Sequence, residues 1–464
     1  MRRIPAVVLL VLAVFALAEF AVLARHSGSS EAPVTIYDSD PSHIWNRLYA
    51  ALWVRQDSHG KRYGEDSLDP PLWTETEYLL AEPSHQIAIK VLDEFLRTHA
   101  ETLVHDPVKR ALLQRDLWAV FDWSVGQSAA NERPDYTLQK RELQSRLAEV
   151  LRRLALTPDE IKSLPDNYAQ AVASGSFAKG FDPTQPDQPF LPPDLFDPHG
   201  PWVCIQPSPE SDSGVASMHI ANFSGRSGFL VFVRLPEGRK ATFEYFRSLW
   251  DFPQPYVQGP SFAADQAPLN PDLPSFPAGT EVALVRRAVL IDNQGNLVAS
   301  SITESVQTRV YHAITTTEER NFGNGNMADI LRNSGQRFYE IKLSRPLLFS
   351  ATHGGLRAVS RDEKELPTFQ QQGDDLIDGS RGRPIRESDL LPELQTCLEC
   401  HSGGGVHSFN SRASLLRPNR MQQEPRDPAY GPFYWSDGAA LAWKQNRYDW
   451  GLLNGYWSAA SPPQ

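Results

Sequence analysis

The chain has few cysteines, no basic run and no internal repeat, and each absence excludes a class of protein. Only three cysteines occur in 464 residues, so a scaffold held together by disulfides is excluded. The formal charge is −11 and no stretch is rich in lysine and arginine, which argues against a nucleic-acid-binding surface. No period of useful length repeats, and no Walker or Rossmann glycine pattern is present. A solenoid and the common nucleotide-binding folds are therefore not predicted.

The overall composition is that of a globular protein with many loops. Hydrophobic residues make up 41% and charged residues 22% of the chain, which excludes wholesale disorder. The length predicts two or three domains. Proline occurs 37 times, above its usual share of about 5%, and this favours loops and turns over an all-helical bundle.

The N-terminus has the pattern of an export signal. Arg2 and Arg3 precede an apolar run over 4–18, which continues beyond Glu19, and a signal peptide is predicted over residues 1–24. An uncleaved membrane anchor is the alternative, because the apolar run is close to the length of about 20 residues that spans a bilayer. Glu19 argues against the anchor, since a carboxylate is costly in hydrocarbon. Both interpretations place the remaining chain outside the cytoplasm, in the periplasm or an equivalent compartment.

Helical periodicity dominates the region 40–175. Apolar residues recur there at the spacing of one helix face. Asp106 followed by Pro107 predicts a helix start, and the sequence Thr157-Pro158-Asp159-Glu160 matches a capping box. Seven prolines then lie between residues 180 and 201. The segment 176–201 is interpreted as a linker, with an ordered proline-rich strap as the alternative.

Strand signals replace helical ones in the region 202–350. The run Gly228–Leu235 is rich in β-branched and aromatic residues. Residues 292–296 have the composition of a hairpin turn between strands at 282–291 and 297–302. Further strands are predicted at 306–314 and 338–343, and one helix at 240–249. Regularity fades over 351–464. The predicted fold class is therefore α+β, with a helical N-terminal region, a mostly antiparallel central sheet and an irregular C-terminal segment.

The strongest chemical motif lies in that C-terminal segment. It is Cys397-Leu398-Glu399-Cys400-His401, whose spacing is that of a c-type haem attachment site. The two thiols can bond to the two vinyl groups of the porphyrin, and the adjacent imidazole can bind the iron as proximal ligand.

On these five residues and the export signal, the chain resembles the c-type cytochromes. The resemblance implies that Cys397 and Cys400 carry the thioether bonds and that His401 binds the iron. It also implies one covalent haem c per chain and attachment outside the cytoplasm, in agreement with the N-terminal signal. Because the motif lies near the end of the chain, we expect the haem on a loop that packs against the rest of the protein.

Other chemistry remains open for the same cysteines. A Cys-x-x-Cys pair also occurs as a structural disulfide, as a redox dithiol, or as half of a zinc site. A zinc site needs two more ligands, for which His401 and His407 are the nearby candidates. The residues before Cys397 lack the β-branched strand that precedes a thioredoxin-like motif.

The sixth ligand of the iron has several candidates. Met421 follows His401 by enough chain to reach the second face of the porphyrin, and it is the predicted distal ligand. The alternatives are His407, His353 and Met327, another ligand, or an open position on the iron.

Three classes of function follow from the motif. The first is electron transfer through haem c to a redox partner that the sequence does not identify. The second is a haem-dependent, peroxidase-like oxidoreductase, which needs an open iron position. The third is a non-haem binding protein whose Cys-x-x-Cys is structural. Electron transfer is predicted, because candidate sixth ligands are present and no distal catalytic set is assigned. No nucleic-acid partner is expected, and membrane contact is expected only if the N-terminal segment is an anchor.

Overall fold

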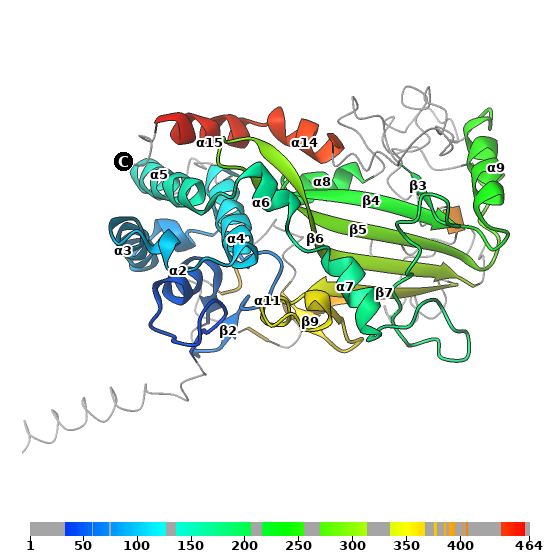
Figure 1. Ribbon diagram of the computed structural model, residues 1–464, viewed down its shortest axis with the longest axis horizontal. Helices are drawn as coiled ribbons and strands as arrows, with labels where there is room; N and C mark the ends of the chain where they lie inside the picture. The colour runs from blue at the N-terminus through cyan, green and yellow to red at the C-terminus, as the bar shows by residue number, and fades with distance from the viewer. Residues whose placement is uncertain are drawn as a thin grey trace, which may run out of the picture.

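The computed structural model consists of a helical region at one end and an antiparallel sheet at the other (Figure 1). It describes residues 33–57, 59–73, 76–126, 136–205, 216–254, 270–312, 335–366, 375–377, 385–386, 389–394, 401, 405–406 and 438–459. The α+β fold class is confirmed. The predicted signal peptide, residues 1–24, lies outside the described residues. Among the helices that are described, none has the length and apolar composition needed to cross a membrane.

Helices α4 and α6 of the N-terminal region begin at the capping groups that the sequence predicts. The Asp106 carboxylate accepts a hydrogen bond from the backbone N–H of Val108 at 2.8 Å, at the start of α4. Thr157 and Glu160 form the predicted capping box of α6. The helices are α2 (Ile44–Trp53), α3 (Ser84–Arg97), α4 (Pro107–Gly126), α5 (Thr137–Leu154), α6 (Pro158–Lys162) and α7 (Asn167–Ser174).

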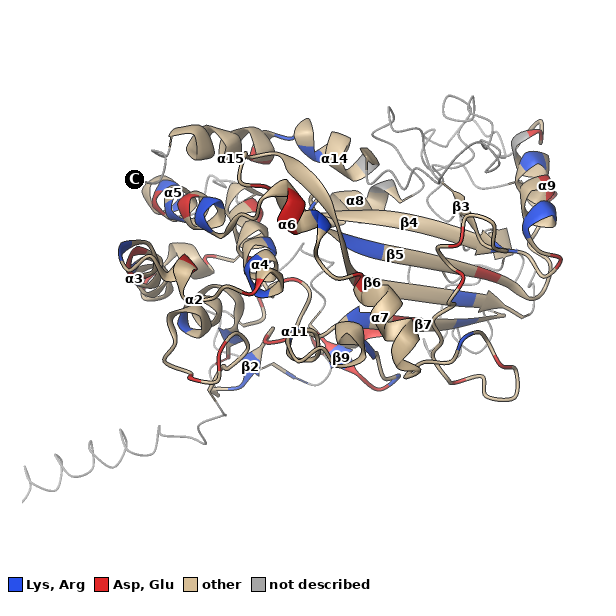
Figure 2. Cartoon of the chain, viewed as in Figure 1, with Lys and Arg blue, Asp and Glu red and all other residues tan. Residues whose placement is uncertain are grey.

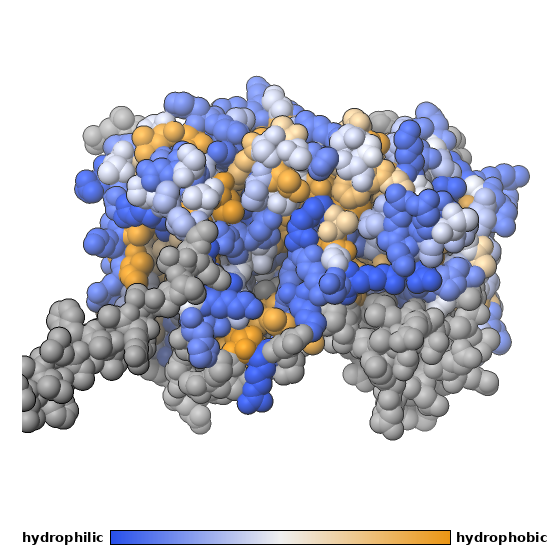
Figure 3. Space-filling model, turned by 90° about the horizontal axis from the view of Figure 1, so that it is seen from below, coloured by the Kyte–Doolittle hydropathy of each residue, from blue (hydrophilic) through white to orange (hydrophobic). Residues whose placement is uncertain are grey.

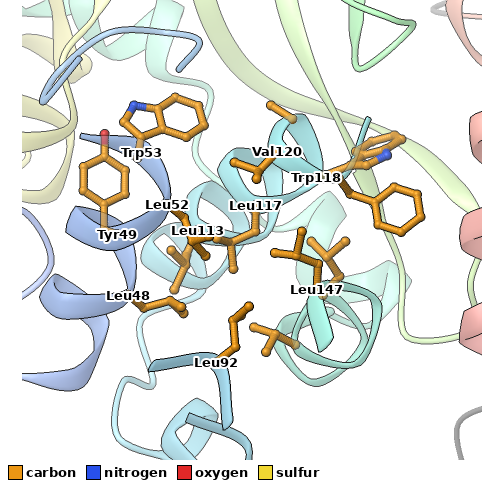
Figure 4. Close-up of a cluster of buried hydrophobic side chains, with 14 of the residues drawn as sticks. Leu48, Tyr49, Leu52, Trp53, Leu92, Leu113, Leu117, Trp118, Val120 and Leu147 are labelled. Carbon is orange, nitrogen blue, oxygen red and sulfur yellow. The ribbon is translucent and has the colours of Figure 1, made fainter. Parts of the chain in front are cut away.

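Helix α4 is the centre of the helical region. Leu113 and Leu117 on α4 pack with Leu48 on α2 and Leu147 on α5 (Figure 4). The same buried cluster includes Ile291 from the sheet. The hydrophobic core of the helical region therefore extends to this end of the sheet.

The main sheet is a six-stranded meander in which sequential strands pair antiparallel. Asp292 forms the tight turn of the predicted hairpin, where its carboxylate accepts hydrogen bonds from the backbone N–H groups of Gln294 and Asn296. The segments 297–302 and 306–314, predicted as two strands, are joined in a single long strand that ends at Tyr311. The strands are β3 (Val203–Ile205), β4 (Ser227–Arg234), β5 (Thr280–Ile291), β6 (Leu297–Tyr311), β7 (Gln336–Leu343) and β8 (Leu356–Ala358).

Different elements of the chain pack on the two faces of this sheet. On the face that we call the α7 face, alternate residues such as Leu230 and Ile341 pack with α7 and with Leu191 of the proline-rich segment. That segment is therefore an ordered strap on the sheet. The opposite face, which we call the α9 face, packs residues such as Val231 against α9 (Arg239–Trp250), the predicted helix. Figure 1 shows α9 at the end of the sheet far from the helical region.

The end of the chain is helical, although an irregular segment was expected there. Helices α14 (Gly438–Gln445) and α15 (Tyr448–Ala459) lie along one side of the molecule (Figure 1). Trp450 of α15 packs on Trp118 of α4, with ring centroids 6.1 Å apart. Because these helices contain glycines and aromatic residues without clear amphipathic spacing, the sequence pattern did not reveal them.

Short elements complete the described chain. They are β1 (Arg55–Gln56), β2 (Arg62–Tyr63), η1 (Tyr78–Leu80), η2 (Ala100–Thr102), α8 (Ser217–Asn222), α11 (Arg345–Phe349), η4 (His353–Gly355), β9 (Lys364–Glu365) and β10 (Leu391–Pro392). The surface seen in Figure 3 is mostly hydrophilic, with apolar residues in scattered patches.

Candidate functional site

His401 is the member of the predicted haem motif that the structure describes, and it lies against the sheet. Its carbonyl oxygen accepts a hydrogen bond from the Gln336 side chain at the start of β7, at 2.7 Å. Val406, a little further along the chain, is fully buried in the cluster on the α9 face. The motif histidine therefore belongs to the folded body of the protein. The other predicted site residues, Cys397, Cys400 and Met421, lie outside the described residues.

A second histidine lies beside His401, and the sequence analysis did not identify it. This is His219 on α8, just before strand β4. The two imidazole rings have centroids 6.2 Å apart and planes that differ by 12°. His219 also contacts the ring of Phe229 on β4, at 5.4 Å between centroids. No motif surrounds His219, so only the fold could show that it lies next to a residue so distant in the sequence.

The surroundings of His219 keep its imidazole neutral. Burial lowers the pKa of His219 to about 4, and the positive charges of Arg309 and Arg286 act in the same direction. A neutral imidazole has a free nitrogen lone pair and is the form that binds metals.

Aromatic rings and arginines line this part of the sheet. The Phe223 and Phe229 rings are stacked with centroids 5.6 Å apart. The guanidinium of Arg286 lies 3.5 Å from the centre of the Phe223 ring, and that of Arg309 lies 4.9 Å from the centre of the Phe338 ring. Porphyrin has flat apolar faces and a central iron. Aromatic rings suit the faces, and the imidazoles of His219 and His401 suit the iron, so these residues fit the group.

Arg286 also belongs to a buried ionic network at the end of the sheet next to α4. Its guanidinium lies 3.0 Å from Asp69 and 2.9 Å from Glu304. Figure 2 shows basic residues on β5 and α14 in this part of the molecule. The network balances four cations against four carboxylates: Arg115, Arg226, Arg286 and Lys444 with Asp69, Asp122, Glu304 and Asp449. Because every charge has an opposite partner, the network joins the helices to the sheet and fixes Arg286 beside Phe223.

An acidic cluster elsewhere has the geometry of a metal site but holds a lysine. Oxygen atoms of Glu363, Glu365 and Glu393 lie within 4.8 Å of one another. The ammonium of Lys342 on β7 contacts all three, at 3.1 Å from Glu363 and 2.6 Å from Glu393, with a close contact to Glu365. The lysine ammonium thus lies where a metal ion would lie in such a site. Close by, burial raises the pKa of Glu340 to about 7.

His353, a candidate sixth ligand from the sequence, lies in a different place. It is exposed, and its Nδ1 is hydrogen-bonded to the Ser176 hydroxyl. Gly354 beside it packs closely on the backbone of α7. His353 is therefore on the α7 side of the sheet, whereas the chain around His401 packs on the α9 face. His407 and Met327 lie outside the described residues.

Comparisons with known proteins identify no relative of this chain. No protein-family model, no curated protein and no solved structure matches the chain.

Proposed function

We propose that the chain is an exported mono-haem c protein that transfers electrons. The observation that carries the proposal is the sequence Cys397-Leu398-Glu399-Cys400-His401, together with the position of its histidine. His401 packs in the folded body, beside a second imidazole and close to aromatic rings. A Cys-x-x-Cys pair with a purely structural role would not need a neighbouring imidazole or nearby aromatic rings.

In this proposal each residue has a defined role. Cys397 and Cys400 would hold the porphyrin through thioether bonds, and His401 would bind the iron. The hydrogen bond from Gln336 to the His401 carbonyl holds the backbone of the motif in place. When bound, haem c supplies an iron that accepts and releases one electron. The rings of Phe229 on β4 and Phe223, just after α8, would exclude water from the haem and so influence its reduction potential.

The N-terminal signal is part of the same proposal. Haem c attachment outside the cytoplasm requires export of the chain, and residues 1–24 have the pattern of an export signal. The protein is then extracytoplasmic, and a redox partner exchanges electrons with the haem there.

The covalent bond provides the test. The full chain, produced in a host that exports it and attaches haem c, is denatured and tested for haem that stays with the polypeptide. We expect one haem per chain. The variant C397A/C400A should lose all covalent haem, whereas C204A, which removes the third cysteine on β3, should keep it. Wild-type protein without covalent haem, or a double variant that retains it, would overturn the proposal.

A further inference from the structure

The relation between the His219 and His401 rings is unusual for two side chains that merely pack together. Their planes are nearly parallel, at 12°, but the centroids are 6.2 Å apart. If the planes were in van der Waals contact at about 3.5 Å, the ring centres would be displaced sideways by about 5 Å. That displacement exceeds the width of an imidazole ring, so the two faces would not overlap. Close face-to-face stacking therefore does not account for the distance between the two centroids.

Coordination of one metal ion by both rings gives a separation of this size. An imidazole nitrogen binds a first-row metal at about 2 Å, and the ring centre lies about 1 Å further away. Two imidazoles on opposite sides of one ion thus have centroids separated by about 6 Å. The observed separation of 6.2 Å agrees with this value.

The position of His219 is also well fixed. Ile220, the next residue on α8, is buried against Ala440 of α14 and packs with Phe229 and Trp443. Gly225, after α8, comes so near to Trp443 that a Cβ atom there would lie 2.9 Å from the indole. A ligand on an element held in this way needs little ordering when it binds a metal.

We propose that His219 is the second axial ligand of the haem iron, opposite His401. This inference rests on the proposed function, and it names the ligand that the function needs. It makes the iron six-coordinate and low-spin, with two imidazole ligands. Such an iron has no open position for a substrate, which favours electron transfer over peroxidase-like chemistry. Ligation by two histidines also gives a lower reduction potential than ligation by histidine and methionine.

The experiment uses the full-length holoprotein and reads the iron directly. Optical and electron paramagnetic resonance spectra of the wild type should show low-spin iron without the charge-transfer band of methionine ligation. H219A should lose the low-spin signal and bind cyanide, and added imidazole should restore the low-spin spectrum. H219M should remain low-spin and show a higher reduction potential. The matched controls H199A, which changes an exposed histidine, and H353A should leave the spectrum unchanged.

The outcomes separate this inference from the proposed function. Wild-type protein with covalent haem whose spectrum changes in M421L but not in H219A would overturn the role of His219 and leave haem c in place. A wild type that is already high-spin and binds cyanide would also overturn it. If no covalent haem is present, the proposed function itself fails. Circular dichroism checks that H219A is folded, and if it is not, H219Q replaces it under the same criteria.

Discussion

The buried ionic network gives the sharpest prediction for stability, through the variant Asp122→Asn. The Asp122 carboxylate accepts hydrogen bonds from Arg226 at 2.6 Å and from Lys444 at 2.7 Å. All three side chains are almost completely enclosed. Asparagine has the same shape, but it removes the negative charge from between two buried cations.

The expected loss of stability depends on the ion pairs that remain in the variant. Arg226 still has Asp69 at 3.5 Å, and Lys444 still has Asp449 at 3.1 Å, so neither cation is left alone. Breaking a buried ion pair by removing one partner costs about 3–5 kcal/mol. We expect a loss near the lower end, about 3 kcal/mol, because each cation keeps one carboxylate. Such a loss is a large share of the roughly 5–15 kcal/mol of a typical domain.

Urea denaturation of the purified protein measures this loss as a lower midpoint with an unchanged slope. The control is Glu244→Gln, which breaks the exposed pair with Lys240 at 3.6 Å and should change the free energy of unfolding by less than about 0.5 kcal/mol. An Asp122→Asn variant within 1 kcal/mol of the wild type would refute the reasoning, because the network would then not depend on this charge.

Three further predictions concern other parts of the chain. Burial raises the pKa of Glu340 to about 7, so the folded state keeps a proton that the unfolded state releases from about pH 4 upward. The free energy of unfolding should therefore fall between about pH 4 and about pH 7. Denaturation experiments on Glu340→Gln should show a smaller fall over the same range. Gly225 has φ +70° and faces Trp443, so Gly225→Ala should lower the melting temperature, whereas Gly180→Ala, with open space around it, should not. Deletion of residues 1–24 should leave the protein in the cytoplasm without haem, and fractionation that finds it exported would contradict the signal.

Local signals in the sequence determined those features that depend on neighbouring residues. The N-cap at Asp106, the capping box at Thr157 and the hairpin turn at 292–296 each act within a few residues, and the structure contains all three. The α+β class was predictable for the same reason, because helical and strand periodicity can be read over short windows. The haem motif is equally local, and it remains a prediction that the covalent-haem test decides.

The tertiary structure decided what depends on residues far apart in the chain. His219 has no distinguishing neighbours in the sequence, and only the packing of α8 beside β4 brings its ring to His401. The C-terminal helices were missed because their stability comes from contacts such as that of Trp450 with Trp118, which no local pattern encodes. Buried charges such as Asp122 look like ordinary surface residues in a sequence. Only folding, which removes water from around them and supplies their partners, makes them part of the core.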